Sequence, residues 1–169
     1  MNSNQYLNFF KNKKILITGH TGFVGSWITY YFYKLGCKIT GVSTREANVN
    51  NIFSILKIKS KIKHYNFDIC EKNKFKIFKN KKFDFVIHLA AKPLVFEGVN
   101  EPDIYIKNNI LSSLNVFSQI KNASVIINFT TDKVYKNKNK INYKYKETDE
   151  LGGDDPYSYS KTCSDLLTK

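Results

Sequence analysis

The chain has 169 residues, and a folded chain of this size buries roughly 70% of its unfolded surface. Its 42% hydrophobic content supplies enough apolar side chains for a core, which indicates one folded domain and argues against disorder. Its formal charge is +13, but Arg45 is the only arginine, and a lysine surplus without arginine does not indicate a nucleic-acid partner. The three cysteines form no CxxC pair, and no run approaches the ~18 apolar residues of a membrane span, so we expect a cytoplasmic protein without a metal cluster.

Short apolar runs alternate along the chain with segments of helical period. We expect strands, in chain order, at 13–18, 38–43, 62–68, 83–91 and 124–130. Helices are expected at 23–36, closed by Gly36, then at 71–80 and 102–121. Continuous apolar strands between helices predict an α/β fold, a Rossmann-type doubly wound parallel sheet with helices on both faces. Ligands of such sheets bind beyond the carboxyl ends of the strands.

The lysine- and tyrosine-rich stretch at 133–147 is the only biased segment of the sequence. Its tyrosines and lysines could stack against and neutralise a single strand of RNA. A solvated loop is the simpler interpretation, because charge runs of this kind usually lie in water.

Glycines at 19, 22 and 25 form a GxxGxxG pattern between the first expected strand and helix. Glycine is needed there for a tight turn, for close approach of backbone amides to a pyrophosphate, and for packing of the helix on the strand. The pattern predicts a dinucleotide site, although a merely structural glycine turn is the alternative. The expected cofactor-binding residues of this motif are Gly19, Thr21, Gly22, Phe23, Val24 and Gly25.

The end of the second expected strand carries Ser43, Thr44 and Arg45, where an NAD site normally has an acidic residue. Two hydroxyls beside a guanidinium can accept a 2′-phosphate, so NADP stays open as an alternative to NAD. Asp68, followed by Ile69, ends the third strand and is placed either to accept from an adenine amino group or to cap a helix.

Tyr157 and Lys161 are four residues apart and therefore project from one face of a helix. An ammonium near a phenol lowers the phenol's pKa and lets it exchange a proton with a sugar hydroxyl. Thr131, Asp132 and Lys133 directly follow the fifth strand, where a hydroxyl and an acid/base pair can meet a substrate. An ordinary solvated turn is the alternative for Asp132 and Lys133.

Together these motifs resemble the extended short-chain dehydrogenase/reductase family, in its NAD-dependent epimerase/dehydratase group, and most closely the CDP-glucose 4,6-dehydratase branch. The resemblance is carried by GHTGFVGSW at 19–27, HLAAKPLV at 88–95, Asn109, and LGGDDPYSYSK at 151–161. It implies further cofactor contacts at Leu89, Ala90, Ala91, Lys92 and Asn109. It implies no metal site. Lys92 departs from an expected glutamine, which would alter contacts near the cofactor.

The resemblance implies a reaction on CDP-D-glucose, with NAD taking hydride from C4 and returning it to C6, in deoxysugar and surface-polysaccharide biosynthesis. Tyr157 would take the 4-hydroxyl proton and Lys161 would hold the cofactor ribose. Thr131 would bind the 4-oxygen, Asp132 would protonate the departing 6-hydroxyl, and Lys133, where many relatives have glutamate, would take the C5 proton.

The resemblance also implies that residues 1–169 are an NAD(P)-binding Rossmann domain that lacks a C-terminal substrate-binding part. We therefore expect an apolar edge and face of the sheet to be uncovered. Two other functions stay open, a non-catalytic dinucleotide-binding half-domain and a nucleotide-sugar epimerase. A homo-oligomer is expected for the full-length enzyme.

Overall fold

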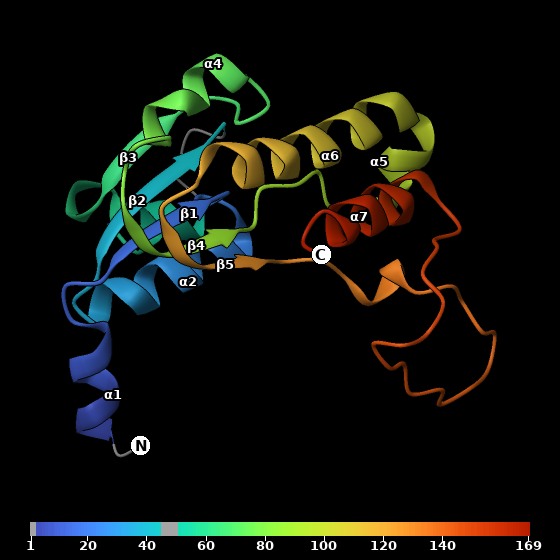
Figure 1. The fold of residues 1–169 in the computed structure, drawn as a ribbon, viewed down its shortest axis with the longest axis horizontal. Helices are drawn as coiled ribbons and strands as arrows, with labels where there is room; N and C mark the ends of the chain where they lie inside the picture. The colour runs from blue at the N-terminus through green and yellow to red at the C-terminus, as the bar shows by residue number, and fades with distance from the viewer. Residues whose placement is uncertain (1–2, 45–50) are drawn as a thin grey trace.

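A computed structural model describes residues 3–44 and 51–169 of the chain. Five parallel strands form one sheet in the order β3-β2-β1-β4-β5 (Figure 1). The strands are β1 (Lys14–Thr18), β2 (Lys38–Ser43), β3 (Lys63–Asn66), β4 (Phe83–His88) and β5 (Ala123–Asn128). Each of them lies within or overlaps one strand expected from the sequence, so the predicted parallel α/β sheet is confirmed.

Seven helices lie in the described part of the chain. They are α1 (Ser3–Phe10), α2 (Phe23–Lys34), α3 (Ile52–Ile55), α4 (Lys72–Phe75), α5 (Val95–Asn100), α6 (Pro102–Gln119) and α7 (Pro156–Leu166). The expected helix at 71–80 is shorter, since α4 passes into a 3-10 turn at Lys76–Phe78. Gly36 ends α2 as predicted, with a φ of 77° and its amide bonded to the Tyr33 carbonyl at 3.0 Å.

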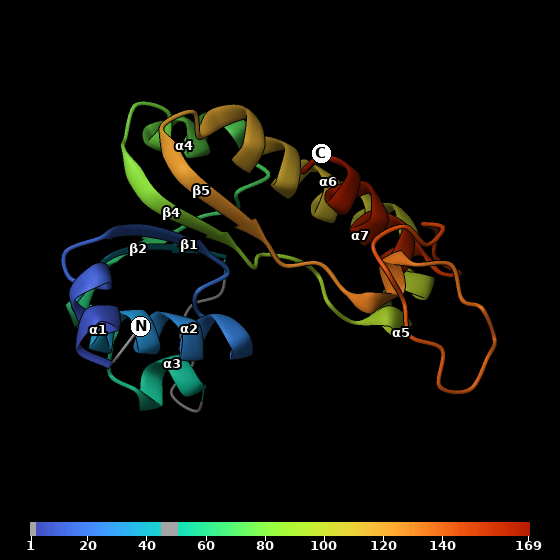
Figure 2. The same cartoon turned by 60° about the horizontal axis from the view of Figure 1, so that its bottom comes forward.

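Helices cover both faces of the sheet, with α1 and α2 on one side and α4 and α6 on the other (Figure 2). Side chains of β1 alternate between the two faces. Ile15 and Ile17 belong to a buried cluster that includes Phe32 of α2, whereas Leu16 belongs to a cluster with Val116 of α6. The doubly wound arrangement predicted from the sequence is confirmed.

Helix α1 was not predicted, because its amphipathic pattern covers only eight residues and no acidic first turn or basic last turn marks its ends. Its last residue, Phe10, packs against Phe32 and Phe85 with ring centroids 5.4 and 5.9 Å away. Tertiary aromatic packing thus holds this short helix against the sheet.

Strand β5 forms one edge of the sheet and leaves apolar side chains in contact with solvent. Val125, Ile127 and Phe129 alternate along one face, and each is 40–44% exposed. Their neighbours in the register on β4, Phe85 and Ile87, are more buried. The expected uncovered apolar edge is therefore present.

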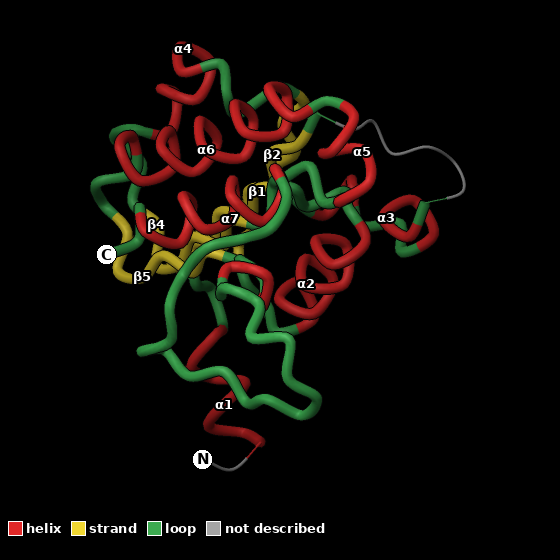
Figure 3. Tube along the Cα trace, turned by 90° about the vertical axis from the view of Figure 1, so that its right-hand side faces the viewer, coloured by secondary structure: helices red, strands yellow, loops and turns green. Residues whose placement is uncertain are grey.

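The stretch between β5 and α7 contains one short helical turn at Asp132–Val134 and otherwise runs as loop (Figure 3). Tyr135 and Tyr145 stack with their ring centroids 5.2 Å apart, and Tyr143 meets Tyr145 edge-on. The loop interpretation is confirmed, and its tyrosines contact one another. Within residues 3–44 and 51–169, no helix has both the length and the apolar character needed to cross a membrane.

Candidate functional site

The glycine-rich turn joins β1 to α2 at the carboxyl edge of the sheet. Gly19 has a φ of 70°, and a Cβ there would lie 2.8 Å from the Ala90 amide nitrogen. Gly22 caps α2 and donates its amide to the Gly19 carbonyl at 3.0 Å. A Cβ on Gly25 would collide with that same carbonyl. The turn therefore requires glycine, and it leaves the first amides of α2 facing a hollow.

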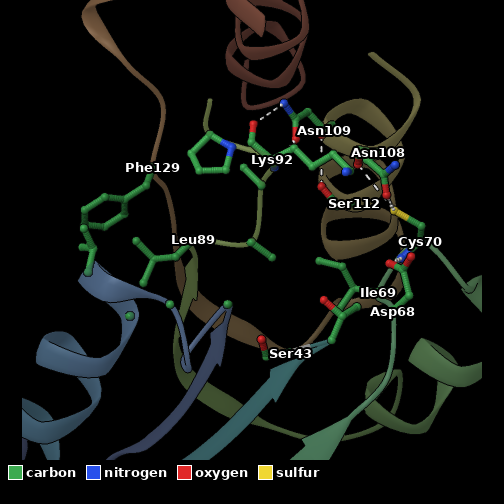
Figure 4. A pocket seen from close by; sticks show the side chains of 18 of the residues that line it. Ser43, Asp68, Ile69, Cys70, Leu89, Lys92, Asn108, Asn109, Ser112 and Phe129 are labelled. Carbon is green, nitrogen blue, oxygen red and sulfur yellow. Dashed lines mark hydrogen bonds between the residues drawn. The ribbon is translucent and has the colours of Figure 1, made fainter. Parts of the chain in front are cut away.

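That hollow is a cleft of about 500 Å³ beyond the carboxyl ends of the strands. Sixteen of the residues expected at the site line it, namely Gly19, Gly22, Phe23, Val24, Gly25, Ser43, Thr44, Asp68, Ile69, Leu89, Ala90, Ala91, Lys92, Asn109, Tyr157 and Lys161. In Figure 4, Asp68 and Ile69 lie on the opposite side of the cleft from Phe129. Residues far apart in the sequence thus form one elongated site.

The Asp68 end of the cleft is built from hydroxyl and carboxylate groups. Ser43 is buried, and its hydroxyl lies 2.7 Å from that of Thr21, which does not itself line the cleft. Asp68 accepts from the Cys70 amide at 2.8 Å, so it caps a turn, whereas α4 begins only after Glu71. Asp68 is therefore not the N-cap of a helix, and the helix-capping alternative is wrong. Arg45, the third member of the expected triplet, lies outside the described residues.

Helix α7 carries the expected tyrosine and lysine. Asp155 caps its first turn by accepting from the Ser158 amide at 3.0 Å, and Pro156 follows at the first helical position. Tyr157 and Lys161 consequently face the cleft from one side of the helix. The one-turn spacing predicted from the sequence is confirmed.

Lys161 is only 4% exposed, and burial lowers its pKa to about 8. Its ammonium donates to the Phe129 carbonyl at 2.7 Å. Burial raises the pKa of Tyr157, against an opposing contribution from the Thr131 hydroxyl. The expectation that Lys161 lowers the phenol pKa is wrong for this state, because the lysine is bound to a carbonyl instead.

Thr131, Asp132 and Lys133 lie near the Tyr157 end of the cleft but outside its lining. Thr131 donates to the Asp132 carboxylate at 3.0 Å and accepts from the Lys133 amide at 3.3 Å. Asp132 and Lys133 are exposed, and none of the three lines the cleft. The structure therefore brings Thr131 near Tyr157 but leaves the acid/base pair in solvent.

Residues 15–169 match the NAD dependent epimerase/dehydratase family. The chain belongs to this family. CDP-glucose 4,6-dehydratase of Salmonella typhimurium is 30% identical over 164 residues, covering 95% of this chain and 45% of that protein. UDP-glucose 4-epimerase of Neisseria meningitidis serogroup B is 32% identical over 163 residues, covering 92% of this chain and 47% of that protein. The chain thus spans about half the length of these relatives.

The solved structures show the same fold. The UDP-Glc/GlcNAc 4-epimerase of Campylobacter jejuni superposes with a TM-score of 0.79 at 26% identity, covering 92% of this chain and 48% of that one. The family's cofactor is NAD, and the glycine turn fits it, because only glycine at 19 and 25 lets this backbone pack so closely where the first residues of α2 line the cleft. Among the described residues, no three His, Cys, Asp or Glu side chains gather as metal ligands.

Seven lining residues were not predicted, namely Phe67, Cys70, Pro93, Asn108, Ser112, Phe129 and Thr130. Five of these residues directly flank a predicted site residue, and widening each motif by one residue would have found those five. Ser112 lies three residues after Asn109 on α6, and helical spacing would have indicated it. Burial, and then Asp68, raise the pKa of the Cys70 thiol to about 12, which disfavours a thiolate at this wall of the cleft.

Lys92, the residue that stands in place of the expected glutamine, is held mainly by its backbone. The Asn109 side chain accepts from the Lys92 amide at 2.8 Å and donates to its carbonyl at 3.2 Å. Its ammonium lies 5.3 Å from the centre of the Tyr105 ring. Lys92 therefore adds a positive charge to the wall of the cofactor cleft.

Proposed function

We propose that residues 1–169 form the NAD-binding Rossmann part of a nucleotide-sugar 4,6-dehydratase in deoxysugar biosynthesis, converting CDP-D-glucose to CDP-4-dehydro-6-deoxy-D-glucose. The observation that carries the proposal is the pair Tyr157 and Lys161, one turn apart on α7 and facing a cleft built for a dinucleotide. The similarity to a CDP-glucose 4,6-dehydratase over 95% of this chain supports the choice of reaction.

When bound, NAD supplies a hydride acceptor for C4 of the sugar and later a hydride donor for C6. Tyr157 would remove the proton of the 4-hydroxyl, because its phenol lines the cleft and lies near the Thr131 hydroxyl. Thr131 would hold the 4-oxygen through that hydroxyl. Lys161 would hold the cofactor ribose through its buried ammonium, which lies beside the Phe129 carbonyl.

The dehydration step needs a base that takes the C5 proton and an acid that protonates the 6-hydroxyl, which then leaves as water. We assign these roles to Lys133 and Asp132. Both follow Thr131 directly, and their exposed side chains would come into a water-poor environment only when substrate covers them.

A UDP-glucose 4-epimerase covers nearly the same part of the chain, which favours an epimerase as the second candidate. The half-length coverage of the relatives favours a non-catalytic dinucleotide-binding half-domain as the third. For each of the three candidate functions, the ligand we propose is a nucleotide sugar or a dinucleotide. We also propose a reducing cytoplasm, in which Cys37, Cys70 and Cys163 stay free thiols.

The test is to mix the chain with CDP-glucose and NAD⁺ and follow the alkaline ultraviolet absorbance of a 4-keto sugar. The dehydratase proposal predicts that this absorbance develops and that Tyr157→Phe abolishes it. Tyr159→Phe is the matched control, since Tyr159 lies on the same helix with its ring 55% exposed, and it should leave the rate unchanged. Cofactor binding without product would favour the half-domain, and CDP-galactose as product would favour the epimerase.

A further inference from the structure

Four buried polar side chains connect the strand ends to α7. His88, the last residue of β4, is 1% exposed, and its Nδ1 lies 2.7 Å from the Thr18 hydroxyl of β1. On the other side of the ring, Nε2 lies 3.1 Å from the Ser113 hydroxyl of α6. Ser113 in turn lies 2.6 Å from the Ser164 hydroxyl of α7. We call this series, Thr18, His88, Ser113 and Ser164, the histidine relay.

The neighbours of the relay fix where its hydrogens lie. The Thr18 hydroxyl oxygen accepts from the amides of Leu89 and Ala90, both at 3.2 Å, so both of its lone pairs are used. Its hydrogen is therefore the one shared with His88 Nδ1. Burial lowers the pKa of His88 to about 3, which keeps the ring neutral. A neutral ring that accepts at Nδ1 carries its proton at Nε2, and this proton is donated to Ser113.

The far end of the relay lies on the face of α7 that bears the proposed reacting groups. Ser164 comes three residues after Lys161 and seven after Tyr157, so all three share one side of the helix. Asn128, at the end of β5, donates to the Ser164 carbonyl at 3.0 Å and to its hydroxyl at 3.1 Å. The carboxyl-terminal half of α7 is thus held by polar contacts against α6, through Ser113, and against β5, through Asn128.

We propose that His88 is a positioning residue, which acts through Ser113 and Ser164 to hold α7 in place. Because α7 carries Tyr157 and Lys161, the relay holds these two side chains against one half of the cofactor cleft. That half is the end opposite Asp68, where the nicotinamide would lie. The inference rests on the proposed function for the roles of Tyr157 and Lys161. Thr18 ties the same relay to the amides of Leu89 and Ala90, which line the cleft.

The relay itself is tested by nitrogen NMR of the histidine side chains in the intact chain, without any cofactor. The expected result is a His88 ring protonated at Nε2, with a slowly exchanging N–H, from pH 8 down to pH 5. In Ser113→Ala this N–H should exchange rapidly, because its acceptor is gone. A His88 ring protonated at Nδ1 would overturn the proposal.

The positioning role is tested by titrating Ser164→Ala with NADH and, separately, with ADP. NADH spans both ends of the cleft, whereas ADP reaches only the adenosine and phosphate end. We expect NADH affinity to fall about fivefold, because the Ser164 hydroxyl loses its contacts with Ser113 and Asn128, with ADP affinity unchanged. The double variant Ser113→Ala, Ser164→Ala should lose no more than Ser164→Ala alone, since both cut one series of contacts.

Ser118→Ala is the matched control, because its hydroxyl makes only a 3.5 Å contact with the Asn115 carbonyl of its own helix. Equal losses of NADH and ADP affinity in Ser164→Ala would show a general loss of structure and overturn the positioning role, as would no loss at all. A wild-type chain that binds neither ligand would contradict the proposed function instead, and the NMR result would still decide the relay.

Discussion

Gly19 is the residue whose replacement tests the glycine turn most sharply. In Gly19→Ala the new Cβ meets the Ala90 amide at 2.8 Å and the residue keeps a φ of 70°. We expect the free energy of unfolding to fall by about 2–4 kcal/mol and NADH binding to be lost, as measured by denaturant titration and by nucleotide fluorescence.

Gly36→Ala separates backbone strain from crowding of the cleft. Gly36 has a comparable φ of 77°, but its nearest contact for a Cβ is ordinary, 3.7 Å to Lys11. We expect a loss of about 1–2 kcal/mol with NADH affinity unchanged. Equal effects of both substitutions on NADH affinity would contradict the account of the turn.

Lys161 makes the stability of the fold depend on pH. Burial lowers its pKa from 10.5 to about 8, so between these values the folded state binds fewer protons than the unfolded state. The free energy of unfolding should therefore rise with pH across this window, relative to Lys161→Met, in which the other lysines are retained. Denaturant titrations of both proteins from pH 7 to 10.5 measure the difference, and a difference that stays flat or falls would contradict a buried ammonium.

At the scale of elements, the start of α7 depends on its cap. Asp155 accepts from both the amide and the hydroxyl of Ser158. Asp155→Ala should lower the free energy of unfolding by about 1 kcal/mol and speed hydrogen exchange in the first turn, whereas Asp155→Asn should retain most of the cap. Unchanged exchange of the Ser158 amide in the alanine variant would show that packing alone holds the turn.

The order of elements could be predicted because periodicity and turn residues are local signals. KILIT before a glycine turn and FDFVIH before LAA indicate β1 and β4 without any knowledge of packing. Helix α1 could not be predicted, since its stability comes from Phe10 packing against residues far along the chain. The positions of Tyr157 and Lys161 could be predicted from helical spacing, but the contact of Lys161 with the Phe129 carbonyl depends on how α7 meets β5.

At the scale of the whole molecule, the edge strand β5 is the most exposed apolar part of the sheet. Val125 and Ile127 present side chains about 44% exposed beside an unpaired strand edge. We expect the chain to associate with itself as concentration rises, and Ile127→Lys to reduce this association in sedimentation velocity. Ile141→Lys adds the same charge at a loop side chain that is 94% exposed and should have little effect.

We propose that the cleft supports hydride transfer within one sugar. The most direct measurement uses CDP-glucose carrying deuterium at C4, incubated with the chain and NAD⁺ and followed by NMR of the sugar product. The account predicts a 4-keto product with the deuterium at C6. Deuterium that remains at C4, whether in unchanged substrate or in an epimer, would contradict it.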